Sequence, residues 1–340
     1  MRVHVLGGGI VGLACADELV ARGHDVVVVD RTPGSGASAV AAGMLSPAAE
    51  TWHGEPELHR LGVASLRLWP EFAARLGVPL HERGTLLVGH DAGDGQEVER
   101  QAEVLDLLGV GVDLLGSRQV RELEPGLGRV ARGFRVADSA VDPRAVVATL
   151  LARLGRHVAP AAPSAVADAV VVATGTRLPA PWTPLVRGVR GEVVRLRTDD
   201  PPGHVVRGWV AGEPVYLVPR AAGELVVGAT LEEHDAPPVP TAGNVLRLLQ
   251  AARTLLPALD RAEVLACEAR DRPATRDHLP LVGPTYDPRT WLAAGHFRHG
   301  VLLAPLTARL LADAVEGAAP DPALDPRRLL DSPAPTGGTS

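Results

Sequence analysis

The chain has 340 residues, enough for a large buried core and better suited to two domains than to one. Its net charge of −6 gives no electrostatic reason to expect nucleic acid as a partner, and it has no run of about 18 apolar residues that could span a membrane. All 34 basic residues are arginine, which excludes a pyridoxal Schiff base and a P-loop lysine. The two cysteines do not form a disulfide framework and no signal peptide is evident, so we expect a cytoplasmic protein.

The first thirty residues predict a nucleotide-binding unit. A buried strand at 3–6 is followed by a helix at 10–21, and an entirely β-branched strand at 26–29 ends at Asp30. Because Asp30 can accept hydrogen bonds from the adenosine ribose hydroxyls, it disfavours the 2′-phosphate of NADP. This unit alone does not separate NAD from FAD.

The glycine-rich turn Gly7–Gly12 lies between the first strand and the helix. Gly7 permits the tight turn, Gly9 lets the backbone approach a pyrophosphate, and Gly12 lets the helix pack closely on the strand. The helix N-terminus attracts the phosphates.

The middle of the chain predicts further elements of both kinds. A segment of small residues at 34–47 precedes helices at 58–76, 97–108 and 142–154 and a strand at 85–88. The apolar strand at 169–172 ends in a turn at Thr174 and Gly175 and indicates a return to the nucleotide-binding domain.

After Pro179 the pattern changes to alternating strands, which are typical of an antiparallel sheet. These are predicted at 191–197 and 205–210 and as a hairpin at 214–230, followed by a helix at 241–256. A strand at 291–295 and a helix at 300–315, with Pro305 in its first turn, come next, and the residues after Gly317 look like a tail. The predicted fold class is α/β, with a discontinuous Rossmann-type domain and an inserted, mostly antiparallel sheet domain.

Several motifs, in this order, resemble the D-amino-acid-oxidase superfamily of flavoproteins, and most closely its glycine oxidases of bacterial thiamine biosynthesis. The last motif is the most specific. The motifs are Gly7–Gly12, Ala41–Leu45, Tyr216–Arg220, Val227–Thr230, Arg272–Thr275, and Gly295–Gly300 running into Val301–Pro305.

The resemblance implies a GR2-like FAD-binding domain at 1–80, 138–180 and 265–325, a substrate domain at 81–137 and 181–264, and a tail at 326–340. It implies non-covalent FAD. Residues matching the family's cofactor contacts are Gly7, Gly9, Ile10, Val11, Gly12, Asp30, Arg31, Ala37, Ser38, Ala42, Gly43, Met44, Thr174, Gly175, His296, Phe297, Arg298, His299, Gly300, Val301 and Leu302.

The substrate residues implied by the resemblance are Tyr216, Arg272 and Arg298. The Arg298 guanidinium would hold the substrate carboxylate bidentately and Tyr216 would add a second hydrogen bond. Because we assign no general base, we expect the substrate to lose its ammonium proton on binding. A hydride would then pass from the substrate Cα to flavin N5, oxygen would reoxidise the flavin to give hydrogen peroxide, and the imine would hydrolyse to an oxoacid and ammonia.

Other interpretations of these residues remain open. Tyr216 can be an ordinary strand tyrosine, Arg272 can hold the flavin or brace its loop, and His296 with His299 has metal-ligand spacing, although no further ligand follows nearby. The expected partners are a small amino acid, oxygen and, as in relatives, further copies of the chain. Alternative functions are a D-amino-acid or secondary-amine dehydrogenase that reduces a quinone or other acceptor, and a non-catalytic binding protein.

The chain differs from the family pattern at three places. Glu268–Asp271 precedes Arg272 where the family usually has a small, apolar Gly-Leu, and Leu231 stands where a glycine oxidase can carry methionine. The segment between Leu154 and Ala169 is short, so we expect the small sheet that reaches the adenine in relatives to be reduced or missing.

Overall fold

The first sheet carries the nucleotide-binding unit predicted at the N-terminus. In the computed structural model, which describes residues 1–330, its strand order is β16-β17-β10-β1-β2-β9, and only β16 and β17 pair antiparallel. The predicted return of the chain to this sheet is confirmed, because β10 pairs with β1. The strands are β1 (Arg2–Leu6), β2 (Asp25–Val29), β9 (Val158–Ala159), β10 (Ala169–Val172), β16 (Leu281–Pro284) and β17 (Thr290–Ala294).

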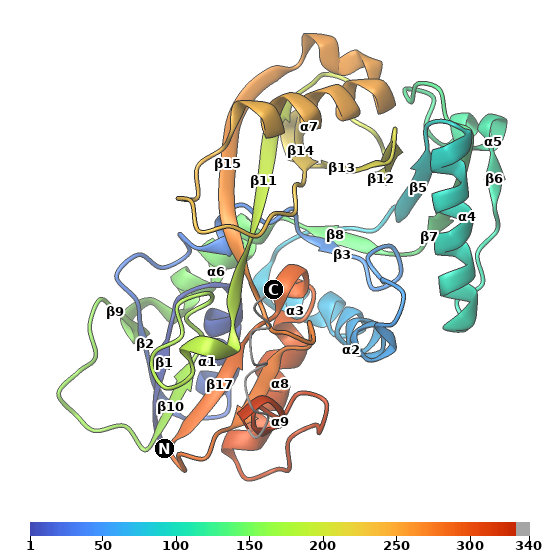
Figure 1. Ribbon diagram of the computed structural model, residues 1–340. Coiled ribbons are helices and arrows are strands. Elements are labelled where there is room, and N and C mark those ends of the chain that lie inside the picture. Colours follow the sequence, from blue (N-terminus) through green and yellow to red (C-terminus); the bar gives the residue numbers. More distant parts are fainter. Residues whose placement is uncertain (331–340) are drawn as a thin grey trace, which may run out of the picture. The chain divides into compact units, whose positions relative to one another are not determined.

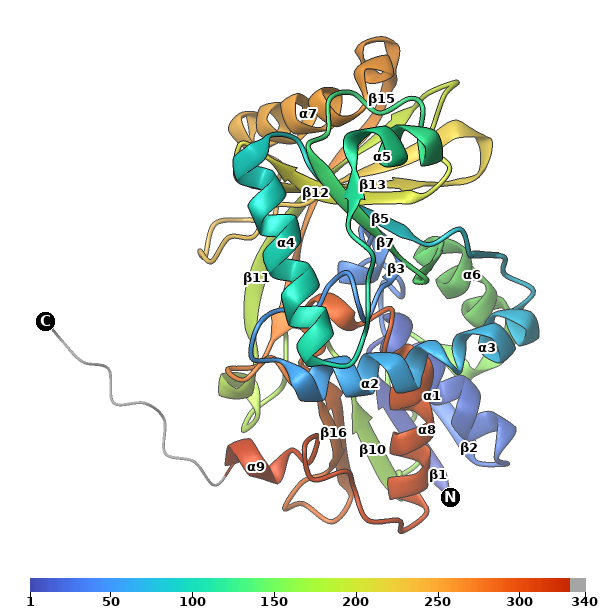
Figure 2. The ribbon, with the colours of Figure 1, turned by 90° about the vertical axis from the view of Figure 1, so that its right-hand side faces the viewer.

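Helices α1 (Ile10–Ala21) and α8 (Ala304–Val315) pack against each other beside this sheet, as Figure 2 shows. The bounds of α1 are those predicted. The prediction that the last long helix begins at residue 300 is wrong, because residues 300–303 form a turn after the 3₁₀ helix at 297–299 and α8 begins only at Ala304. Pro305 lies in the first turn of α8, where its missing N–H removes no helical hydrogen bond.

Residues 318–330 do not form the tail expected after Gly317. The N–H of Val282 on β16 donates to the carbonyl of Leu324 over 2.8 Å, and Leu324 and Leu329 are buried. Helix α9 (Arg327–Leu330) belongs to this folded segment, whose two leucines bury apolar area that a free tail would expose to water. Residues 331–340, the rest of the expected tail, lie outside the described residues.

The second sheet is the mostly antiparallel one expected after Pro179. Its order is β15-β11-β14-β13-β12-β5-β7-β6, with β5 and β12 parallel. β15, at one edge, was not predicted, because its charged residues hide any alternation. The strands are β5 (Thr85–Gly89), β6 (Leu115–Gly116), β7 (Arg132–Val136), β11 (Arg187–Arg197), β12 (Val205–Val210), β13 (Glu213–Pro219), β14 (Glu224–Gly228) and β15 (Glu263–Ala274).

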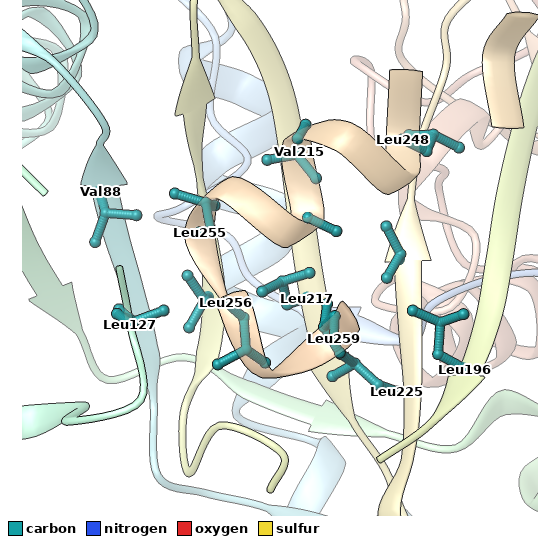
Figure 3. Packing of buried hydrophobic residues seen from close by; sticks show 14 of the residues in the cluster. Val88, Leu127, Leu196, Val215, Leu217, Leu225, Leu248, Leu255, Leu256 and Leu259 are labelled. Carbon is teal, nitrogen blue, oxygen red and sulfur yellow. The ribbon is translucent and has the colours of Figure 1, made fainter. Parts of the chain in front are cut away.

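Helix α7 (Ala242–Leu255) covers one face of this sheet (Figure 1). Leu248 and Leu255 on the helix face Val215 and Leu217 of β13 and Leu196 of β11, and all five are at most 5% exposed (Figure 3). The aliphatic core beneath α7 keeps β11, β14 and β13, the strand that carries Tyr216, in a fixed arrangement.

A small third sheet has the order β3-β8-β4. Its strands are β3 (Met44–Leu45), β4 (Leu80–His81) and β8 (Ser139–Val141). The helix predicted at 58–76 is instead two helices. Pro70 cannot continue a helix begun earlier and lies in the first turn of the second one. The remaining helices are α2 (Pro56–Leu66), α3 (Trp69–Leu76), α4 (Ala92–Leu107), α5 (Ser117–Leu123) and α6 (Pro143–Leu154).

The chain forms two compact units. The first contains residues 1–35, 147–188 and the described chain from 272, and the second contains residues 36–146 and 189–271. Residues 36–80 and 138–146, expected in the FAD-binding domain, therefore pack within the second unit, where β3, β4 and β8 pair with one another. The functional assignment of the two domains stays a prediction.

The segment between α6 and β10 is short, as expected, and no small sheet forms within it. Between Leu154 and Ala169, the only strand is the two-residue β9, which pairs with β2. Within residues 1–330, no helix has the length and apolar character needed to cross a lipid bilayer.

Candidate functional site

The glycine-rich turn closes tightly onto the end of β10. Gly7 has φ +108°, and a Cβ atom there would lie 2.3 Å from the carbonyl oxygen of Ala173. A Cβ at Gly12 would lie 2.1 Å from the carbonyl oxygen of Gly7. Both positions therefore require glycine, as predicted from the motif. Gly9 is the N-cap of α1 and no side chain caps that helix, so its N-terminus can receive an anion.

Asp30 orders the same turn from the end of β2. Its carboxylate accepts the N–H of Gly8 over 2.7 Å and the N–H of Thr32 over 2.8 Å. A carboxylate has about four acceptor positions, so two remain for ribose hydroxyls. Asp30 thus has a structural role in the turn in addition to the predicted ribose contact.

We expect Asp30→Ala to weaken FAD binding by about 10- to 150-fold, since hydrogen bonds to a charged group contribute about 1.5–3 kcal/mol each. The measurement is a fluorescence titration of the flavin-free protein with FAD. Asp25→Ala is the matched control, because Asp25 lies on β2 but its side chain is 64% exposed and pairs with Arg2. Equal affinities of the two variants would remove Asp30 from the cofactor site.

Thr174 places a polar atom beside the glycine-rich turn Gly7–Gly12. Its Oγ1 is buried without a hydrogen-bond partner among residues 1–330, and its Cα would lie 3.1 Å from a Cβ at Gly7. A buried hydroxyl without a partner is costly, so a ligand oxygen is the natural partner. Together with the uncapped helix and the glycine turn, Thr174 fits the pyrophosphate of a dinucleotide.

The segment 37–44 belongs to the second unit and meets β8. Gly43 has φ +73°, and a Cβ there would lie 2.0 Å from the carbonyl oxygen of Val141. Ala42 and Met44 are buried in a cluster with valines of β11 to β14, and Tyr216 packs against the same cluster. The structure therefore brings three of the predicted residues of this unit together.

The position of Tyr216 depends on a glycine that we did not include among the site residues. Tyr216 on β13 pairs with Gly228 on β14, and a Cβ at Gly228 would lie 2.4 Å from the Tyr216 hydroxyl oxygen. The ring therefore lies over the backbone of Gly228. The available signal was a glycine at the end of a strand pattern, which often marks such a close approach.

The loop 295–300 and the strand end that carries Arg272 are neighbours within the first unit. Ala274 forms an antiparallel bridge with His296, and a Cβ at Gly295 would lie 2.4 Å from Cγ2 of Thr275. Arg298 follows in the 3₁₀ turn, with its guanidinium carbon 5.2 Å from the centre of the Phe297 ring. The structure therefore brings the two predicted arginine-bearing segments side by side.

His296 is buried and neutral. Its Nε2 is 2.9 Å from Oγ1 of Thr307 on α8, and burial lowers the pKa of His296 to about 3. It therefore joins the loop to α8 as an uncharged group. Within residues 1–330, no group of three His, Cys, Asp or Glu side chains could hold a metal ion.

We expect this burial to make folding less stable in acid. Because the folded pKa of His296 lies below its ordinary value of about 6.5, the unfolded chain takes up the proton first, and stability falls as pH falls from about 6.5 toward 3. His296 alone then costs about 2 kcal/mol at pH 5 relative to pH 7.5. The free energy of unfolding in urea at both pH values should show a smaller difference for His296→Gln than for the exposed control His53→Gln. A pH difference that is the same in both variants would contradict this role.

The remaining predicted cofactor residues are divided between the two units. Ile10, Val11, Arg31, Gly175, His299, Gly300, Val301 and Leu302 belong to the first unit, and Ala37 and Ser38 to the second. Their contacts with a cofactor stay predictions.

The fold and these sites define a dinucleotide-binding α/β protein with a second, sheet-based unit. A family model described as FAD dependent oxidoreductase (DAO) matches residues 2–314. The chain belongs to this family of flavoproteins, and its cofactor is FAD.

Named relatives agree with the family assignment. The chain is 36% identical over 325 residues to a Rhizobium etli protein that is named as a thiamine biosynthesis oxidoreductase, ThiO. The alignment covers 91% of this chain and 94% of that protein. It is 32% identical to the glycine oxidase of Geobacillus kaustophilus, with 92% of each chain covered. The crystal structure of glycine oxidase from Geobacillus kaustophilus superimposes with a TM-score of 0.82, covering 94% of this chain and 96% of that chain, at 29% identity.

Proposed function

We propose that this protein is an FAD-dependent amino-acid oxidase that acts on glycine or another small amine and serves thiamine biosynthesis. The observation that supports it most is the pairing of the Arg272 strand end with the Arg298 loop, in a chain similar to ThiO and to a glycine oxidase over nearly its whole length. Two arginines on adjacent segments suit a substrate with one carboxylate.

The chain's own residues bind and orient the substrate. The Arg298 guanidinium takes the carboxylate bidentately, and Arg272 and the Tyr216 hydroxyl complete its hydrogen bonds. This fixes the Cα–H bond in one direction, which lowers the entropic part of the barrier. No lysine is present and no base is assigned, so the substrate amine loses its proton as it enters the site.

Non-covalently bound FAD, held by the Gly7–Gly12 turn, Asp30 and Thr174, would supply the redox chemistry: it would take two electrons from the substrate and pass them to oxygen as hydrogen peroxide, and the imine would hydrolyse in water to an oxoacid and ammonia. The N-terminal end of α8 and the loop 300–302 contribute partial positive charge toward the cofactor.

The test is the visible spectrum of the purified protein without oxygen, before and after addition of glycine. Bleaching of the flavin band at about 450 nm, followed by peroxide when oxygen is admitted, is the expected result. Bleaching without peroxide would make the protein a dehydrogenase of the same fold. A yellow protein that glycine leaves unchanged would exclude glycine and direct the search to D-amino acids and secondary amines. Yellow colour that leaves with the small molecules after denaturation would establish non-covalent binding, and a colourless protein would contradict the proposal.

A further inference from the structure

Three arginine side chains hold the backbone of residues 39–42 within the second unit. The carbonyl oxygen of Ala39 accepts Nε of Arg144 over 2.7 Å and Nη2 of Arg195 over 3.3 Å. The carbonyl oxygen of Ala42 accepts Nη2 of Arg220. These arginines come from α6, from β11 and from the residue after β13, so three distant parts of the chain converge on four residues.

Two glutamates hold Arg144 and Arg195 in place. The Glu268 carboxylate receives Nη2 of Arg144 at 2.6 and 2.8 Å and Nε of Arg195 at 2.8 Å. Glu224 receives Nη1 of Arg195 at 2.8 Å. Arg195 is only 3% exposed. Burial works against its charge, but the hydrogen bonds that it donates to Glu268 and Glu224 raise the pKa of Arg195 overall. It is a fixed cation whose direction is set by its partners.

Little other secondary structure holds this segment. Residues 37–39 form one 3₁₀ turn, and only Met44 and Leu45 pair with β8. The arginines are the donors to the backbone carbonyls of Ala39 and Ala42. The course of the backbone between the turn and β3 therefore depends on side chains from elsewhere in the fold.

We propose that Arg195, Arg144 and their shared partner Glu268 are positioning residues that hold residues 39–42 in the course required for FAD binding. The proposal rests on the proposed function, which places residues 37–44 along the flavin. It gives Glu268 a purpose at a place where the sequence departs from the family pattern. We call these residues the arginine clamp.

A purely structural interpretation is that Glu268 only ties β15 to β11. A second ion pair on these two strands provides the matched control. Arg197 of β11 pairs with Glu263 of β15 over 3.2 Å, but their side chains are 55% and 68% exposed. Within the described part of the chain, neither of these two side chains hydrogen-bonds to residues 39–42. If ties between the strands were all that mattered, E268Q and E263Q would differ only in the size of their effect on overall stability.

The experiment compares the full-length protein loaded with FAD as wild type, E268Q, E263Q and R144A. Two quantities are measured: the rate of FAD release on dilution, from the rise in flavin fluorescence, and amide hydrogen exchange in residues 36–46. We expect E268Q to release FAD about 10-fold faster or more and to exchange faster in this segment, while E263Q matches the wild type. R144A removes a donor whose side chain is 42% exposed, so it tests the clamp even if E268Q does not fold.

Unchanged exchange in both E268Q and R144A would overturn the clamp. Faster exchange with unchanged FAD release would overturn its role in FAD binding. A wild-type protein that takes up no FAD would refute the proposed function instead. The hydrogen-exchange data would still test separately whether the arginine clamp holds residues 39–42.

Discussion

Replacing Arg298 with alanine is expected to lower kcat/KM for glycine by about 30- to 5,000-fold while FAD stays bound. Losing one partner of a desolvated charge pair costs about 2–5 kcal/mol, because the substrate carboxylate then enters the site without its counter-charge. The half-buried Arg298 is held in the 3₁₀ turn over the Phe297 ring, so its guanidinium has a defined direction. Steady-state oxygen consumption with glycine measures the effect.

Two controls make this result specific to carboxylate binding. Arg298→Lys keeps the charge without the planar fork and should recover only part of the activity. Arg309→Ala removes an exposed arginine on α8 of the same unit and should leave kcat/KM unchanged. Ethylamine lacks the carboxylate, so the preference for glycine over ethylamine should collapse in Arg298→Ala. If that preference is retained, another residue binds the carboxylate.

Replacing Gly228 with alanine should lower kcat/KM for glycine by about 100-fold, the scale of effect that a displacement of about 1 Å can produce. The new methyl group would lie 2.4 Å from the Tyr216 hydroxyl oxygen and 2.5 Å from its Cζ, distances that two atoms in contact cannot hold. Because Tyr216 packs against the cluster containing Ala42 and Met44, its ring can move only by disturbing that cluster.

The control for this prediction is Gly243→Ala on α7, where a Cβ would have no neighbour within 4 Å. Tyr216→Phe separates the hydroxyl from the ring, and it should lose activity without the overpacking cost of about 1–3 kcal/mol expected for Gly228→Ala. Thermal unfolding measures that cost. Full activity in Gly228→Ala would show that the position of Tyr216 does not matter for catalysis.

Sequence patterns predicted the elements in which an apolar run or a regular apolar–polar alternation extends over the whole element. α1 has its predicted bounds, and β2, β10 and the hairpin of β13 and β14 lie where apolar runs or alternation placed them. Patterns failed where tertiary partners decide the structure. β15 carries Glu268 and Asp271, whose charges are acceptable in a strand because arginines of β11 lie opposite them.

The candidate site divides in the same way. Gly7, Gly12 and Asp30 could be assigned from sequence because their roles are local to one turn and its flanking strands. Gly228 and Arg195 could not, because each acts on a residue from another part of the chain. The family's motifs located Tyr216, Arg272 and Arg298 without showing what holds each of them.

The sequence by itself determined that this protein binds a dinucleotide, that it cannot use lysine chemistry, and that it resembles flavin-dependent amine oxidases, since local spacing and residue type suffice for each. Only the tertiary structure decided which glycines make room for which side chains, that residues 318–330 fold onto β16, and that arginines hold the backbone of residues 39–42. Packing and buried hydrogen bonds join residues far apart in the chain, and no local pattern records such partners.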